Sequence, residues 1–460
     1  MTPIEIFERY QSGDLIGCIK AGSERLNDHP DCLETLFVIG QAYMKADRHG
    51  LAYNIYRRIV EVDPSNATAW NNAGHAMHGI QRYKEASRCF IESLKTGGDR
   101  FAPYNNLVLM HQNLGDVVKS KELFRLARWH VETPADVADC TGNISLSLLA
   151  TRHWATGWDA YENLIRPDKL RKETKYEPDL PMWDGSPGGE VVVFDEQGLG
   201  DGLLFASMVP DAMQHVTPIL DCDPRLATIF RRSFGCPVYG TRGLAKPWLS
   251  DHRPKAKIAI GSLARLYRRD EASFPRVPYL KPDPGKRAMA RALLDQWPGR
   301  KIGLAWTGGK RHTRQADRSL SLEQLEPILN IPGCTFINLQ YDGDYYASPD
   351  QRIKHVPIFT QTRDYDDTAS LLNECDAAIC VTTAAAFLAG AVGTPCRVLV
   401  PNYPTWHWPR TGECPWFPIT LHRRQGQDWR PAIEEVRQAL IRDCADSHAI
   451  PAPGQQEAAQ

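Results

Sequence analysis

The chain has 460 residues, with 54 Lys and Arg against 55 Asp and Glu, and a formal net charge of −1. A chain of this length is expected to hold two or three domains. The balanced charge argues against a general nucleic-acid binder, which needs a basic surplus for its phosphate contacts. No stretch approaches the roughly 20 apolar residues that cross a bilayer, and the charged N-terminus lacks the apolar core of a secretory signal. We therefore expect a cytoplasmic protein without a membrane span.

The 12 cysteines are scattered along the chain, without a Cys-x-x-Cys pair and without histidine pairs at metal-binding spacing. This pattern favours reduced, buried thiols over disulfides. It offers no candidate metal ligands.

In the first third of the chain, similar residues recur at a spacing of 34. The equivalent positions include Leu36, Trp70 and Tyr104; Gly40, Gly74 and Val108; and Tyr56, Phe90 and Phe124. A period of 34 is typical of the tetratricopeptide repeat, a helix pair that buries its apolar face only by stacking on its neighbours. Because these segments resemble such repeats, we expect an α-solenoid with a concave groove over residues 1–135.

Asn72 and Asn106 occupy equivalent positions of two successive repeats, as do Asn71 and Asn105, whereas Val38 breaks the pattern in the first full repeat. A side-chain amide both donates and accepts, so it suits an extended peptide backbone. Protein O-linked sugar transferases with similar repeats line their groove with asparagines at this position, which makes Asn72 and Asn106 candidate acceptor-binding residues. The alternative is that these asparagines are solvated or cap helices, because Asn readily bonds to nearby backbone.

Residues 136–185 are expected to form capping helices and a linker. The pattern stays helical to about residue 164 and includes Trp154, Trp158 and Tyr161. Residues 178–189 are then rich in Pro and Gly, a composition that neither helices nor strands tolerate. The next domain is therefore expected to begin near residue 186.

Residues 191–206 give the clearest local signal, because an apolar run stops at a Gly-x-Gly-Asp loop and resumes as an apolar helix. In open α/β sheets, ligands bind beyond the carboxyl ends of strands, where helix N-termini offer free N–H donors. Gly198 and Gly200 let a bound group approach the backbone, and Asp201 is placed to meet a substrate. Alternatively, Asp201 only caps the helix. The loop lacks the third glycine of the dinucleotide fingerprint, which argues against a nicotinamide enzyme.

Short apolar runs then alternate with helical stretches, which predicts parallel β/α units in two halves, 186–285 and 286–446, joined by a proline-rich linker at 275–284. Strands are expected at 217–221, 237–239, 257–260, 301–306, 335–340, 377–381 and 396–400. Helices are expected at 322–330, 366–374, 383–392 and 431–443. Residues 447–460 are expected to be a disordered tail.

Two loops of the second half are candidate anion-binding sites. Residues 307–310, Thr-Gly-Gly-Lys, directly follow a predicted strand and begin the densest basic loop of the chain, which continues to Arg318. Glycine and lysine after a strand suit an anion nest, and the alternative is a solvated charged loop. Residues 382–384, Thr-Thr-Ala, open a predicted helix whose free N–H groups suit a phosphate, and the alternative is an ordinary threonine cap.

The aromatic cluster near the end of the second half contains Trp406, His407, Trp408, Trp416 and Phe417. Sugars and bases stack on aromatic faces, but a cluster of Trp and Pro more often packs inside a domain. We interpret this cluster mainly as core, with His407 as a secondary candidate for the site.

Several motifs follow one another in order over nearly the whole chain. They are Trp154-x3-Trp158-x2-Tyr161, Pro181-x-Trp183-x-Gly185, Glu-Gln-Gly-Leu-Gly-Asp at 196–201, Arg-Ser-Leu at 318–320, Asn338-Leu339-Gln340, Asp-Thr-Ala at 367–369, Leu-Ala-Gly-Ala-Val-Gly-Thr-Pro at 388–395, Trp406-His407-Trp408 and Pro-Trp-Phe-Pro at 415–418. This order resembles that of bacterial proteins that join tetratricopeptide repeats to a heptosyltransferase-like GT-B glycosyltransferase domain, among them flagellin-modifying transferases. The resemblance implies two Rossmann-like halves after the solenoid.

The resemblance also implies a mechanism. GT-B enzymes bind a nucleotide sugar mainly through the C-terminal half, take the acceptor on the N-terminal half and usually need no metal or other cofactor. The Asp of the Gly-Asp loop, proposed as the general base in heptosyltransferase relatives, corresponds to Asp201; such a carboxylate takes the proton of a hydroxyl as the sugar carbon is attacked. The candidate donor-binding residues are Gly198, Gly200, Thr307, Gly308, Gly309, Lys310, Arg318, Gln340, Thr382, Thr383 and Ala384.

Two positions depart from the family pattern, because Thr382 and Phe387 stand where relatives usually carry Asp and His. The departure indicates either another donor class or lost catalysis. We predict a transferase that glycosylates Ser or Thr of a protein held by the repeats, with flagellin as the named candidate. The alternatives are a noncatalytic interaction scaffold with a degenerate transferase domain, and transfer to a lipid or polysaccharide.

Overall fold

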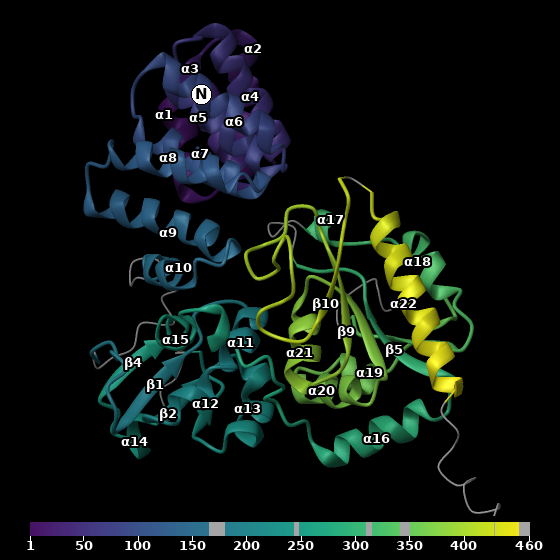
Figure 1. The fold of residues 1–460 in the computed structure, drawn as a ribbon. Helices are drawn as coiled ribbons and strands as arrows, with labels where there is room; N and C mark the ends of the chain where they lie inside the picture. The colour runs from purple at the N-terminus through teal and green to yellow at the C-terminus, as the bar shows by residue number, and fades with distance from the viewer. Residues whose placement is uncertain (165–179, 243–247, 310–314, 341–349, 427, 450–460) are drawn as a thin grey trace, which may run out of the picture. The chain divides into compact units, whose positions relative to one another are not determined.

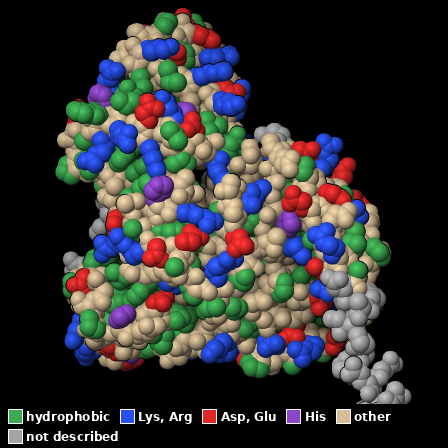
Figure 2. All heavy atoms as spheres, viewed as in Figure 1, with side chains coloured by type: hydrophobic (Ala, Val, Ile, Leu, Met, Phe, Trp, Pro, Cys, Tyr) green, Lys and Arg blue, Asp and Glu red, His purple; other side chains and the backbone are tan. Residues whose placement is uncertain are grey.

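The computed structural model describes residues 1–164, 180–242, 248–309, 315–340, 350–426 and 428–449 (Figure 1). Contacts divide the chain into two units, Met1–Thr151 and Arg152–Gln460. The segment 136–185 is split by this division, because α9 (Pro134–Ala150) belongs to the first unit and α10 (Trp154–Tyr161) to the second. On the face that Figure 2 shows, basic and acidic side chains are interspersed, which agrees with the balanced charge of the chain.

Several helices of the first unit begin at residues whose side chains cap them. Thr2 accepts a hydrogen bond from the backbone N–H of Glu5, and Asn66 accepts one from Ala69, which satisfies N–H groups that lack a partner within the helix. Its described helices, besides α9, are α1 (Pro3–Ser12), α2 (Leu15–Asp28), α3 (Leu33–Lys45), α4 (His49–Val62), α5 (Ala67–Gly79), α6 (Tyr83–Thr96), α7 (Phe101–Leu114) and α8 (Val117–Arg128).

The 34-residue period reflects a glycine of one helix packed against a ring of the next. A Cβ at Gly40 would lie 2.8 Å from the Tyr56 ring, and a Cβ at Gly74 would lie 2.5 Å from the Phe90 ring. Each glycine thus lets two helices approach until the ring between them is fully buried. The third repeat has Val108 at this position, and Phe124, its matching ring, is only half-buried.

The second unit contains two parallel sheets. The first has the order β3-β2-β1-β4, so the chain turns back after β3 and adds β4 on the other side of β1. The strands are β1 (Glu190–Phe194), β2 (Thr217–Asp221), β3 (Val238–Tyr239) and β4 (Ala256–Ala259). The helices are α11 (Leu199–Ala206), α12 (Val209–Ala212), α13 (Ala227–Phe234), α14 (Trp248–Asp251) and α15 (Leu263–Tyr267).

The second sheet has the order β10-β9-β8-β5-β6-β7. In Figure 1 it lies between α20 and α21 on one side and α18 and α22 on the other. The strands are β5 (Arg300–Ala305), β6 (Cys334–Asn338), β7 (Ile353–Lys354), β8 (Ala377–Val381), β9 (Cys396–Val400) and β10 (Thr420–Arg423). The helices are α16 (Pro284–Leu294), α17 (Gln315–Arg318), α18 (Leu322–Leu329), α19 (Pro357–Thr360), α20 (Tyr365–Asn373), α21 (Ala384–Val392) and α22 (Arg430–Ala449).

Each sheet therefore has a point where the strand order reverses, between β1 and β4 in the first and between β5 and β8 in the second. Loops that leave the carboxyl ends of two such strands diverge to opposite faces, which opens a crevice for ligands. The Gly-Asp loop follows β1, and the loops at 307–310 and 382–384 follow β5 and β8. All three predicted loops thus begin at reversal points.

The expected strands at 217–221, 377–381 and 396–400 coincide with β2, β8 and β9, and the other expected strands differ by one or two residues at an end. The sequence analysis did not predict β7 or β10. With two residues, β7 is too short to show a pattern, and β10, Thr-Leu-His-Arg, has no apolar run.

The close approach of α5 and α6 generates a prediction. Gly74→Ala is expected to lower the free energy of unfolding by about 1–3 kcal/mol, because the new methyl group overlaps the buried Phe90 ring. Gly50→Ala is the matched control, since a Cβ there meets nothing within 4 Å and Ala favours a helix by up to about 1 kcal/mol. Urea unfolding of both variants measures the difference, and equal stabilities would contradict this packing.

Candidate functional site

Asp201 lies in the first turn of α11, and both of its carboxylate oxygens have partners. Its Oδ2 accepts the backbone N–H of Gly198 at 3.2 Å. Gly198 is the cap residue of α11, so Asp201 bonds back to the cap from the third helical position, whereas the simpler alternative expected a cap that bonds to the N–H groups of the next turn. Its Oδ1 lies 2.8 Å from Nε2 of His407. The Asp201 side chain is still 24% exposed. The carboxylate is therefore held from two sides and remains open to solvent.

His407 comes from the loop that follows β9 in the second half. Its Nδ1 lies 3.1 Å from Oγ1 of Thr405, and its ring stacks on that of Trp406 at a centroid distance of 3.9 Å. The sequence analysis ranked His407 second because Trp and Pro surround it. That interpretation of its neighbours is confirmed, since Trp408, Trp416 and Phe417 are buried. The buried cluster nonetheless presents the imidazole of His407 to Asp201.

The loops at the second reversal point are tied together. The backbone N–H of Thr307 donates to Oε1 of Gln340 at 3.2 Å, and Nε2 of Gln340 donates back to Oγ1 of Thr307 at 2.5 Å. A Cβ at Gly308 would lie 2.7 Å from Cγ2 of Thr383, so the loops after β5 and β8 touch. The Gln340 amide thus joins the carboxyl ends of β5 and β6, a role that its assignment as a donor-binding residue did not foresee.

The basic part of this loop is only partly described. Gly309 has a φ of 77°, a left-handed conformation that favours glycine. Lys310 lies outside the described residues. Arg318 ends α17, and Ser319 beside it accepts a hydrogen bond from the N–H of Gly308 at 3.4 Å.

At the start of α21, Thr383 is the cap and accepts the N–H of Ala385 at 3.0 Å, as the threonine-cap alternative predicted. Thr382 is only 2% exposed, and its Oγ1 has no hydrogen-bond partner among the described residues. A buried hydroxyl without a partner costs about 1–3 kcal/mol. The Thr382 hydroxyl therefore lowers stability in this structure, and ligand binding at this helix start stays a prediction.

The two reversal points meet each other. A Cβ at Gly200 would lie 3.4 Å from Cδ2 of Phe387 and 3.6 Å from the Cα of Ala384. The first turns of α11 and α21 are therefore in contact, and the structure brings the Gly-Asp loop together with residues 382–384. Phe387, one of the two departures from the family pattern, stacks on Trp408 at 4.6 Å with an interplanar angle of 3° and lies 5.9 Å from the His407 ring.

Helix α10 supports this junction with aromatic side chains. Trp158 is 1% exposed and packs edge-to-face against Phe205 of α11 and against Trp406 and Trp416 of the second half. The Tyr161 hydroxyl accepts a hydrogen bond from Nε2 of Gln197. The loop before Asp201 and the loop that carries His407 thus share one buried support.

Behind Asp201, two carboxyl groups are buried at the carboxyl end of β1. Burial, reinforced by the charge of Asp195, raises the pKa of Glu196 to about 8, and burial raises the pKa of Asp195 to about 6 against the opposing effect of Arg242, 3.3 Å away. Oε1 of Glu196 accepts from Gln197 at 3.0 Å, while its Oε2 has no hydrogen-bond partner among the described residues. The sequence analysis missed both groups, because their burial is visible only in the fold.

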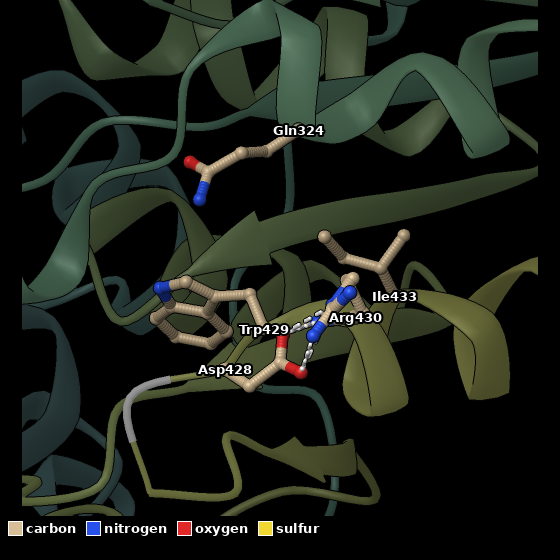
Figure 3. A pocket seen from close by; sticks show the side chains of 5 residues that line it. All are labelled: Gln324, Asp428, Trp429, Arg430 and Ile433. Atoms are coloured by element: carbon tan, nitrogen blue, oxygen red, sulfur yellow. Dashed lines mark hydrogen bonds and ion pairs between the residues drawn. The ribbon is translucent and has the colours of Figure 1, made fainter.

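A separate hollow of about 520 Å³ lies between the first turns of α18 and α22 (Figure 3). Its walls are formed by Gln324, Asp428, Trp429, Arg430 and Ile433. Gln324 accepts the N–H of Ser321 at 2.9 Å, and Asp428 pairs with Arg430 at 2.7 Å, so these groups serve the two helix starts. None of the predicted site residues lines this hollow.

The asparagines of the first unit form links between repeats. Nδ2 of Asn106 donates to Oδ1 of Asn71 at 3.1 Å and lies 3.1 Å from Nε2 of His75, and Nδ2 of Asn143 donates to Oδ1 of Asn105 at 2.9 Å. Asn72 is half-buried and makes no side-chain hydrogen bond to any described residue. Of the two predicted acceptor-binding residues, Asn72 has its whole amide available, and Asn106 keeps only its oxygen.

No group of three or more His, Cys, Asp or Glu side chains among the described residues is arranged to hold a metal ion. Within the same residues, no helix combines the length and the apolar character needed to cross a bilayer. Metal independence stays a prediction.

Comparisons with known proteins bear on both units. A tetratricopeptide repeat family model matches residues 33–66. Protein FlbA of Caulobacter vibrioides is 29% identical over 444 residues, which cover 91% of this chain and 74% of FlbA. Protein O-mannosyl-transferase TMTC3 of Homo sapiens is 24% identical over 76 residues, 16% of this chain and 8% of TMTC3. A crystal structure of MamA, 20% identical, covers 34% of this chain and 91% of its own, with a TM-score of 0.31.

The prediction of tetratricopeptide repeats is therefore confirmed, and the repeats are followed by a domain with parallel sheets and helices. Such repeats bind other proteins, which supports a protein partner for the first unit.

The buried Glu196 generates a pH prediction. Its pKa is about 8 in the folded protein against an ordinary 4.5, so the folded state holds an additional proton between these values. Protonation of Glu196 therefore stabilises the folded state fully below about pH 4.5. As the pH rises to about 8, the free energy of unfolding falls by up to about 1.4 kcal/mol per pH unit. Glu196→Gln should flatten this dependence in urea unfolding between pH 5 and 8. The exposed Glu8→Gln serves as the control, and parallel curves for wild type and Glu196→Gln would contradict the assignment.

Proposed function

We propose that this protein transfers a sugar from a nucleotide-sugar donor to a Ser or Thr hydroxyl of a protein bound by its tetratricopeptide repeats, with flagellin as the named candidate. The observation that carries the proposal is the contact between the first turns of α11 and α21, in which Gly200, next to Asp201, lies against Ala384 and Phe387. This is the arrangement expected where a GT-B fold brings acceptor and donor together.

Asp201 acts as the general base in this proposal. Each carboxylate oxygen accepts more than one hydrogen bond, so both Oδ1 and Oδ2 keep capacity for an acceptor hydroxyl beside the bonds they already make. The hydroxyl oxygen attacks the anomeric carbon and its proton passes to Asp201. The bond from that carbon to the donor phosphate oxygen breaks, and the leaving nucleotide takes the electron pair.

The departing phosphate needs donors, and the start of α21 supplies them. Thr383 already accepts the N–H of Ala385, so it is the positive end of the helix dipole that favours an anion there. The Thr382 hydroxyl, buried without a partner among the described residues, adds a further donor. Lys310 is proposed to neutralise the same charge, which would stabilise the transition state for departure.

The proposed acceptor site is the groove of the repeats. Asn72 offers a free amide that both donates to and accepts from an extended peptide, and the links of Asn106 to Asn71 and His75 keep neighbouring repeats in register with it. Such backbone contacts recognise an extended Ser or Thr segment with little dependence on its sequence.

The first test measures the thermal shift and calorimetric binding of the purified chain with nucleoside mono- and diphosphates and their sugar conjugates. A selective ligand supports the transferase and names the donor class. If the protein is folded and binds none of these compounds, the transferase proposal is contradicted and the noncatalytic scaffold is favoured. The scaffold is motivated by Thr382 and Phe387, which stand where the resembled transferases usually carry Asp and His.

Asp201→Asn is expected to lower the rate of transfer by about 10²- to 10⁴-fold, because the amide cannot accept the proton of the acceptor. Donor affinity and the circular dichroism spectrum should be retained. The exposed Asp295→Asn, also in the second unit, is the matched control and should transfer normally. Undiminished turnover of Asp201→Asn, measured with radiolabelled donor, would remove Asp201 from the mechanism.

Asn72→Ala is expected to weaken the binding of unmodified flagellin by about two- to tenfold, the usual range for one or two lost hydrogen bonds. Asn54→Ala, on the exposed side of α4, is the matched control. Calorimetry of the two variants gives the comparison. Equal affinities would place the acceptor elsewhere, which is also the result expected for a lipid or polysaccharide acceptor.

A further inference from the structure

We infer that His407 is the positioning residue for Asp201, and that it fixes the catalytic carboxylate of the first half from the second half. This inference rests on the proposed function. It concerns the 2.8 Å contact between Nε2 of His407 and Oδ1 of Asp201, which joins elements 206 residues apart in sequence.

The direction of this hydrogen bond follows from its partners. An ionised carboxylate only accepts, so Nε2 of His407 carries the proton and donates to Asp201. The other nitrogen, Nδ1, faces the Thr405 hydroxyl at 3.1 Å, which donates to a neutral ring and accepts from a protonated one. The imidazole therefore donates to Asp201 whichever state it takes.

The His407 ring has contacts besides Asp201 that hold its orientation. Its face lies on Trp406 at 3.9 Å, and Trp406 is itself packed against Trp158 and Phe205. The centroid of the Phe387 ring lies 5.9 Å from that of His407. An imidazole held by these contacts determines the position of the carboxylate oxygen to which it donates.

Two donors fix the plane of a carboxylate better than one. The N–H of Gly198 holds Oδ2 at 3.2 Å from within the first half, and His407 holds Oδ1 from the second. With both bonds in place, the plane of the Asp201 carboxylate is fixed, and each oxygen keeps capacity for an acceptor hydroxyl. Displacement of a catalytic group by about 1 Å can lower the rate by about 10²-fold.

The experiment compares two substitutions that divide the roles of the imidazole. His407→Phe keeps a ring for Trp406 and removes the donor, whereas His407→Gln keeps an N–H donor and removes the ring. The probe is whichever of UDP-N-acetylglucosamine, GDP-mannose and CMP-N-acetylneuraminate is turned over with flagellin. We expect His407→Phe to lower kcat by about 10- to 100-fold with the KM for donor changed less than about twofold, and His407→Gln to restore most of kcat.

Activity of His407→Phe equal to wild type, or a loss in His407→Gln as large as in His407→Phe, would overturn the inference, because packing alone would then explain the residue. In an Asp201→Asn background, His407→Phe should cause no further loss, and an additive loss would also contradict it. If Asp201→Asn is impaired and His407→Phe is not, only the inference fails. If Asp201→Asn is fully active, or if no donor is turned over, the proposed function fails and the inference falls with it.

Discussion

The second unit depends on the packing of Trp158. This side chain, 1% exposed, contacts Phe205 of α11 and both Trp406 and Trp416 of the loop after β9, so one indole joins α10 to elements of both parallel sheets. Each such aromatic pair contributes about 0.5–1.5 kcal/mol beyond the area it buries. The buried Trp158 ring therefore contacts elements of both halves and holds them together.

The same packing sets the geometry of the candidate site. Phe205 lies one helical turn after Asp201 on α11, and residues four apart share a face of a helix. His407 directly follows Trp406, whose ring stacks on Phe205 at 6.2 Å. Phe205 and Trp406, which both pack on Trp158, thus position Asp201 and His407. This packing explains how these two residues, far apart in sequence, come to lie 2.8 Å apart.

Local signals predicted the elements and the reversal-point loops well. A Gly-x-Gly-Asp loop after an apolar run, or a recurrence of similar residues every 34 positions, is a pattern that the sequence shows by itself. The pairing of Asp201 with His407 and the burial of Glu196 depend on contacts between distant segments, which no single-chain spacing reveals. The burial predicted for Trp416 was correct. The same aromatic composition led to a low rank for His407, because the loop contributes both buried aromatic rings and one polar side chain to the site.

The Thr382 hydroxyl differs in its hydrogen bonding from other buried hydroxyls of the second half. In the same half as Thr382, the buried hydroxyls of Thr368, Ser370 and Thr394 donate to backbone carbonyls at 2.7–2.9 Å. The hydroxyl of Thr382 and one oxygen of Glu196 have no such partner among the described residues, and each lies at a reversal point of its sheet. An unpaired buried polar group lowers stability, so a hydrogen-bond partner for the Thr382 hydroxyl would be favourable. In the proposed transfer, the donor phosphate is proposed as that partner.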